Sequence, residues 1–152
     1  MRLLHYFAYG SNMSKKRLKE RKIIATNPRP AHLSGYRLEF NKVAKCSARV
    51  AYANIVIDAN SLVEGILYDI DETNLEKLDH FEGCKSGDYK RSKVNVRLSD
   101  NQQIIAETYI ACLEKLKEGL KPCKEYMCFL FDGKDYLSPN YLRKLEAVET
   151  VD

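Results

Sequence analysis

The sequence of 152 residues lacks any apolar run close to the roughly 18 residues that a membrane-spanning helix needs. No segment of signal-peptide type precedes the first predicted strand, which begins at Leu3. The five cysteines form no C-x-x-C pair, and the three histidines are too scattered to complete a zinc site. We therefore expect a cytoplasmic protein with reduced thiols, no metal and no membrane association.

A strong charge imbalance is also absent, because 25 basic and 21 acidic residues leave a net charge of +4. The basic residues do cluster between positions 15 and 22. No aromatic residues are interleaved with them, as a platform for single-stranded nucleic acid requires, so we expect no nucleic-acid binding. A solvated helix face is the commoner explanation of such a cluster, and an acidic protein partner is the alternative.

With 45% hydrophobic residues, the chain is most simply one domain over residues 1–152. Apolar or alternating runs predict strands at 3–9, 36–41, 50–58, 62–70, 89–98 and 104–111. Helices are predicted at 15–22, 72–80, 122–133 and 139–148. Strands and helices do not alternate strictly, which argues against a parallel α/β sheet. The order predicts an α+β fold with a mixed, curled, barrel-like sheet and flanking helices.

Several local signals mark the boundaries between these elements. Residues 27–30 (NPRP) predict a rigid extended connector, and residues 58–61 (DANS) predict a turn. Gly65 falls within a predicted strand, which often marks a bulge or a close backbone approach. Asp71 is a good N-cap for the helix that follows it, and Gly83 is placed to end that helix.

The most informative stretch is residues 6–13 (YFAYGSNM). An aromatic strand breaks at Gly10, Ser11 and Asn12, which favour turns, and a basic helix follows. This geometry leaves backbone N–H groups unpaired, so the turn can hold a carboxylate, a phosphate or a developing oxyanion. Neither of the glycine-rich nucleotide-binding spacings is present. Taken alone, an ordinary tight turn with a capping serine or asparagine explains these residues better.

Glu82 stands out among the carboxylates because it ends a short amphipathic helix directly before a glycine-containing loop. Its apolar neighbours Phe81 and Cys84 favour partial burial, which would raise its pKa toward the range useful for proton transfer. The alternative is a solvated glutamate at a helix end. His80 is a competing base, although a histidine at a helix end is usually a surface or capping residue. Cys84 shows no sign of thiolate activation and is treated as a small apolar residue.

Residues 6–13 resemble the signature loop of the γ-glutamylcyclotransferase (AIG2-like) family, Y-F-A-Y-G-S-N-[LM]. Residues 78–89 (LDHFEGCKSGDY) resemble the family's L-D-x-x-E-G-x-x-x-G-x-Y segment, where the family keeps its catalytic glutamate. Residues 138–149 are similar to its closing helix. Two motifs in register, about 70 residues apart, are hard to obtain by chance. The resemblance covers nearly the whole chain and favours the functional interpretation of both motifs.

The resemblance implies an enzyme without a cofactor that converts a γ-glutamyl amino acid or amine to 5-oxoproline and a free amine. The α-amine of the substrate attacks its own γ-carbonyl group, and Glu82 serves as general base and acid. The implied substrate-binding residues are Tyr9, Gly10, Ser11, Asn12 and Tyr89. The N–H groups of the loop would hold either the α-carboxylate or the oxyanion. The two tyrosines would close the pocket and contribute hydroxyl contacts, with ordinary core packing as the alternative.

Several alternatives stay open. The leaving group stays open among an amino acid, an amine, a lysine side chain and another group such as that of an antibiotic intermediate. Glutathione is less favoured because glutathione-degrading relatives resemble Y-G-S-L. A non-catalytic module that binds small carboxylates is the rival from another class, although the charge of Glu82 argues against it. Residues 58–62 replace a Pro-Gly turn of relatives, which alters only a hairpin. The sequence ends at Asp152, before the tail of some animal members, so dimer contacts inferred from that tail do not carry over. We expect a monomer or a homodimer.

Overall fold

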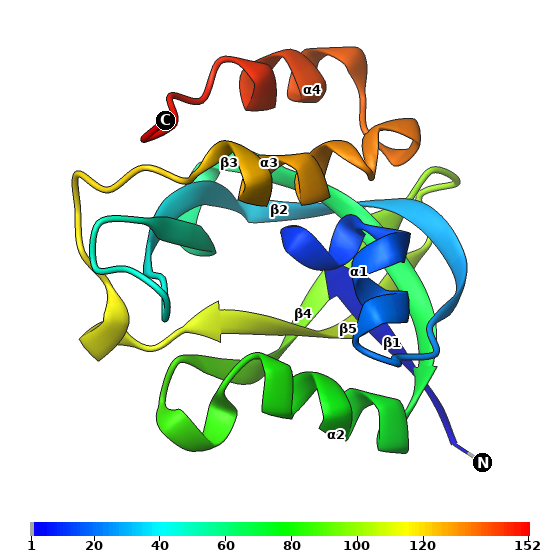
Figure 1. Ribbon diagram of the computed structural model, residues 1–152. Helices are drawn as coiled ribbons and strands as arrows, with labels where there is room; N and C mark the ends of the chain where they lie inside the picture. Colours follow the sequence, from blue (N-terminus) through cyan, green and yellow to red (C-terminus); the bar gives the residue numbers. More distant parts are fainter. Residues whose placement is uncertain (1) are drawn as a thin grey trace.

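A computed structural model describes residues 2–152, in which five strands close into a barrel in the order β1-β3-β2-β4-β5 (Figure 1). The strands are β1 (Leu3–Ala8), β2 (Thr26–Val43), β3 (Ala51–Asp71), β4 (Tyr89–Leu98) and β5 (Gln103–Ala111). β1 pairs with β5 in parallel at Tyr6 and Glu107, whereas the other paired strands are antiparallel. The predicted α+β fold with a mixed, barrel-like sheet is confirmed.

Within the described residues, four α-helices lie around the barrel: α1 (Lys15–Glu20), α2 (Glu72–Phe81), α3 (Lys124–Phe131) and α4 (Pro139–Glu146). Figure 1 shows α2 on one side of the barrel and α3 and α4 on the other. As predicted, Asp71 caps α2, because its carboxylate accepts the backbone N–H of Asn74 at 2.8 Å. Gly83 follows α2 with φ at +68°, a left-handed conformation that glycine adopts without strain. Within residues 2–152, none of the helices has the length and apolar character needed to cross a membrane.

The predicted turn at residues 58–61 is wrong, because β3 runs without interruption from Ala51 to Asp71. Residues 58–61 are unpaired within this strand, because Ser34 of β2 pairs with Leu62 and Tyr36 pairs with Ile57, so one residue of β2 lies opposite four residues of β3. They form a bulge in β3. The residue of β2 opposite the bulge is Gly35, with φ at +85°. The Asp58 carboxylate accepts hydrogen bonds from the N–H of Asn60 and the hydroxyl group of Ser61, so the turn-forming residues shape a bulge and do not end the strand.

The predicted connector at residues 27–30 is wrong as well, because these residues lie in β2. Arg29 and Pro30 pair with Leu67 and Ile66 of β3, after a register shift that follows Thr26. Proline tolerates such a position next to an irregularity in the ladder. Pairing with a distant strand therefore overrides the local proline signal.

Gly65 marks a close approach of β1 and β3, as its position predicts. A Cβ atom at Gly65 would lie 2.3 Å from the carbonyl oxygen of Ala8 and 2.9 Å from the ring of Phe7. Phe7 is fully buried, and its carbonyl group accepts a hydrogen bond from the hydroxyl group of Thr108 in β5 at 2.8 Å. These contacts hold the end of β1, from which the conspicuous 10–12 turn departs.

Candidate functional site

A pocket of about 140 Å³ opens beside the end of β1. It brings together all six residues that the sequence singles out, namely Tyr9, Gly10, Ser11, Asn12, Glu82 and Tyr89. They come from the turn after β1, from the end of α2 and from the start of β4. His80, the competing base, is exposed and is not part of the pocket lining. The pocket has the size for a small polar molecule.

The end of α2 positions Glu82. Its backbone N–H closes the last helical turn on the carbonyl oxygen of Leu78 at 2.8 Å. At Gly83 a Cβ atom would lie 2.4 Å from the carboxylate of Asp88, so glycine lets this turn pack against the start of β4. Glu82 lines the pocket and is partly buried.

Burial raises the pKa of the Glu82 carboxyl group above its ordinary value. The nearby positive charges of Arg21, Arg17 and Lys42 act in the opposite direction, as does a hydrogen bond from Asn12. Burial outweighs them. The result is a carboxylate that holds a proton more readily than an exposed glutamate does.

Asn12 connects the turn to this carboxylate. Its Nδ2 atom donates to Glu82 Oε1 at 3.0 Å and to the hydroxyl oxygen of Tyr6 at 2.9 Å. Its Oδ1 atom accepts from Nη1 of Arg21 at 3.0 Å. Because an amide offers donors on one side and acceptors on the other, these partners determine the orientation of the Asn12 side chain.

The turn itself presents free donors. The carbonyl groups of Gly10 and Ser11 accept hydrogen bonds within the turn, yet none of the hydrogen bonds in residues 2–152 uses the N–H of Gly10, Ser11 or Asn12. A Cβ atom at Gly10 would lie 3.3 Å from both the Cβ of Ala53 and the hydroxyl oxygen of Tyr126. Glycine therefore lets the backbone approach the pocket wall, and the three N–H groups remain available to an anion.

Tyr9 and Tyr89 are buried and form walls of the pocket. The hydroxyl group of Tyr9 donates to the backbone carbonyl of Tyr109, and that of Tyr89 donates to the carbonyl of Ala53 at 2.7 Å. Their hydroxyl hydrogens are thus engaged by the protein. Tyr126 differs, because its hydroxyl oxygen accepts the N–H of Ala53 at 3.0 Å and its own hydrogen stays available.

The family described as "Gamma-glutamyl cyclotransferase, AIG2-like" matches residues 6–128. The chain belongs to this family. It is 31% identical over 152 residues to the gamma-glutamylcyclotransferase of Homo sapiens, covering 97% of this chain and 79% of the relative. A solved structure of a gamma-glutamyl cyclotransferase superposes with a TM-score of 0.86 at 28% identity, covering 99% of this chain and 90% of the other. The putative gamma-glutamylcyclotransferase YkqA of Bacillus subtilis (strain 168) is 29% identical over 147 residues, which are 94% of this chain and 51% of that protein.

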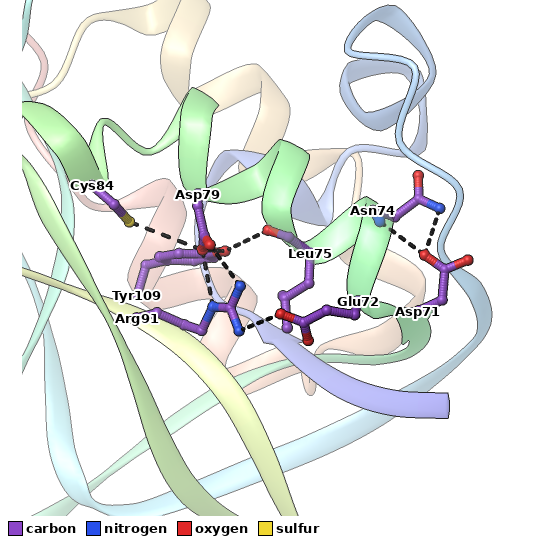
Figure 2. Close-up of polar contacts among 8 residues, drawn as sticks. All are labelled: Asp71, Glu72, Asn74, Leu75, Asp79, Cys84, Arg91 and Tyr109. Carbon is purple, nitrogen blue, oxygen red and sulfur yellow. Dashed lines mark hydrogen bonds and ion pairs between the residues drawn. The ribbon is translucent and has the colours of Figure 1, made fainter. Parts of the chain in front are cut away.

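A polar network fastens α2 to the barrel of this cyclotransferase-family chain (Figure 2). The guanidinium group of Arg91 in β4 binds Asp79 at 3.0 and 2.6 Å and reaches Glu72 at 3.2 Å. The hydroxyl group of Tyr109 donates to Asp79 at 2.7 Å. Burial and the charge of Asp79 raise the pKa of Cys84 to about 11, so this thiol stays protonated. The network holds the helix whose end carries the candidate base.

The cations of the pocket are not recognisable from the sequence pattern. Arg17 and Arg21 belong to the basic run that is typical of a solvated face, yet both line the pocket. The available signal was their spacing of four residues, which places them on one face of a helix. Lys42 is 1% exposed, with its Nζ 3.2 Å from Asp88 Oδ1. A lysine within a strand pattern carries no local sign of such burial.

Proposed function

We propose that this chain is an enzyme that converts a γ-glutamyl amino acid or amine into 5-oxoproline and a free amine. The observation that carries the proposal is the hydrogen bond of 3.0 Å between Asn12 and Glu82. It joins a carboxylate of raised pKa to a turn with three unpaired N–H groups in one small pocket. Membership of the gamma-glutamyl cyclotransferase family supports the same reaction class.

The reaction needs no external nucleophile. The α-amine of the γ-glutamyl group attacks its own γ-carbonyl carbon, and the new C–N bond closes a five-membered ring. The tetrahedral intermediate then collapses, the original amide C–N bond breaks, and the leaving nitrogen takes up a proton. Because the α-amine and the γ-carbonyl group belong to one molecule, the attack is intramolecular, which is worth about 7–11 kcal/mol over a bimolecular reaction when the groups are well oriented. The pocket mainly has to fold the substrate and move one proton.

Glu82 is the proposed carrier of that proton. The α-amine is an ammonium ion at neutral pH and must lose a proton before it can attack. A carboxylate whose pKa is raised by burial is a stronger base than an exposed one, and it returns the proton to the leaving nitrogen more easily than a lysine would. Positioned acid–base catalysis of this kind contributes about 10²–10⁴-fold to the rate.

The N–H groups of Gly10, Ser11 and Asn12 are the proposed anion site. They suit either the α-carboxylate or the oxyanion that forms on the γ-carbonyl oxygen. The hydroxyl group of Tyr126, which faces the same pocket, is a further donor for this anion. These donors are held by the backbone and by the core, so they require little reorganisation during the reaction.

The test is release of 5-oxoproline from γ-glutamyl-alanine, γ-glutamyl-ε-lysine, glutathione and glutamine. We expect turnover of at least one substrate and a loss of about 10²–10⁴-fold in kcat for Glu82→Gln. Glu76→Gln is the matched control, since it removes an exposed carboxylate from the same helix. Near-normal cyclisation by folded Glu82→Gln would remove Glu82 from the mechanism. No release from any substrate, with substrate-like molecules still binding, would favour the non-catalytic carboxylate-binding module.

A further inference from the structure

Four cationic side chains line the pocket, and three of them are already engaged by protein groups. Arg21 donates to Asn12 at 3.0 Å. Lys42 and Lys45 lie 3.2 and 3.5 Å from the two carboxylate oxygens of Asp88. The fourth cation, Arg17, differs from these three because no protein group accepts a hydrogen bond from its guanidinium group or forms an ion pair with it in the described residues.

Arg17 lies in α1. Its guanidinium group lies over the ring of Phe129, 4.4 Å from the ring centre, and no hydrogen bond or ion pair of that group occurs within the described part of the chain. Its Nε atom is buried and unpartnered. A buried donor without an acceptor is costly, and a planar guanidinium group matches a carboxylate with two parallel hydrogen bonds. The free donors of Arg17 thus indicate an anionic ligand group with two oxygens.

The charges of the pocket point to the part of the substrate that carries this group. Its cations outnumber its carboxylates, which are Glu82 and Asp88, by two. A γ-glutamyl amine is electrically neutral, because its α-ammonium and α-carboxylate groups cancel. A γ-glutamyl amino acid carries one more carboxylate, on the leaving group. The three N–H groups of the turn and the Tyr126 hydroxyl group together offer donors for the α-carboxylate and the oxyanion of the γ-glutamyl part. The leaving-group carboxylate has no donor among them.

We propose that Arg17 binds the carboxylate of the leaving amino acid and thereby determines the specificity of the site. This proposal rests on the proposed cyclotransferase function. Arg17 makes a γ-glutamyl amino acid a better substrate than a γ-glutamyl amine of the same size. The cation–π contact with Phe129 restrains the guanidinium group, so less side-chain entropy is lost when the carboxylate binds.

A matched pair of substrates tests this assignment. γ-Glutamyl-alanine and γ-glutamyl-ethylamide differ only in the leaving-group carboxylate. We expect Arg17→Met to lower kcat/KM for γ-glutamyl-alanine by about 10–100-fold and for the ethylamide by less than about threefold. Both substrates are compared on the pH plateau of each variant, because the charge of Arg17 also lowers the pKa of Glu82. Lys16→Gln, which removes an exposed charge from the same helix, should leave the ratio of the two values unchanged.

Each other outcome has a separate meaning. Equal losses for both substrates would overturn the assignment, because Arg17 would then act on the shared γ-glutamyl part or on the fold. A changed ratio in Lys16→Gln would overturn it in favour of long-range electrostatics. If Arg17→Met does not fold, Arg17→Lys keeps the charge without the planar fork, and an unchanged ratio there would also overturn the proposal. No turnover of either substrate by the unmodified protein would instead contradict the proposed cyclotransferase function, and with it the role of Arg17.

Discussion

Asn12 and Glu82 lie 70 positions apart in the sequence, and the side-chain amide of Asn12 donates to the Glu82 carboxylate at 3.0 Å. Arg21 holds the other end of the same amide. Turning the amide over would lose these bonds, so the donor stays directed at the carboxylate. The contact ties the turn after β1 to the end of α2, and a change at Asn12 should therefore alter the acid–base behaviour of Glu82.

Asn12→Ala removes a hydrogen bond that lowers the pKa of Glu82. The pKa of Glu82 should rise further, and Glu82 accepts a proton only above that pKa. We expect the acid limb of kcat/KM to move to higher pH and kcat to fall about 10–100-fold. A pH–rate profile beside the exposed control Asn60→Ala measures both effects. An acid limb that stays in place would contradict the proposed link.

Glu82→Gln should stabilise the fold at neutral pH. Burial raises the pKa of Glu82 in the folded state above the ordinary value of 4.5. The stability associated with its proton is complete below the unfolded-state pKa and is lost as the pH rises through the folded-state pKa. Glutamine carries no charge at any pH, so Glu82→Gln avoids this loss of stability. Its Tm should exceed that of the unmodified protein above the folded-state pKa, and the difference should vanish near about pH 4. A difference in Tm that grows toward low pH would show that folding lowers the pKa of Glu82 and does not raise it.

Ser11→Ala should be much milder than Gly10→Leu. The proposed anion site uses the backbone N–H of Ser11, which alanine keeps, so kcat/KM should change by less than about threefold. A side chain at Gly10 meets Ala53 and Tyr126 at 3.3 Å from its first carbon, and the displaced turn should cost about 10²–10³-fold. Steady-state kinetics with circular dichroism as the folding control separates the two. Equal losses would transfer the binding role to the serine hydroxyl group.

Tyr89→Phe should affect stability more than activity. The Tyr89 hydroxyl group donates to the buried carbonyl of Ala53, so its removal should cost about 1–3 kcal/mol in the free energy of unfolding. We expect kcat/KM to fall less than tenfold. Urea denaturation measures the first quantity, with Tyr36→Phe as a control on a partly buried tyrosine. A large loss of activity at unchanged stability would assign the hydroxyl group to the substrate.

Local signals were sufficient where neighbours in the sequence make the decisive contacts. The strands β4 and β5, the Asp71 cap and the glycine that ends α2 follow from the sequence alone, since each depends on a few adjacent residues. The predictions for residues 27–30 and 58–61 were wrong because contacts with distant residues decide their structure. The ladder between β2 and β3 includes Arg29 and Pro30 and continues on both sides of residues 58–61, which form a bulge within β3 and not a turn between two strands. The pairing partners lie far away in the sequence.

The sequence by itself determined the family, the turn after β1 and the carboxylate at the end of α2, because both motifs keep a strict residue order. Only the tertiary structure decided which charged side chains lie beside this turn and this carboxylate. Arg17 looks like one more cation on a solvated helix until α1 is placed against Phe129. Lys42 looks exposed until Asp88 is brought to it. Burial and charge pairing depend on contacts between segments that are distant in the sequence. Local periodicity in the sequence does not predict such contacts.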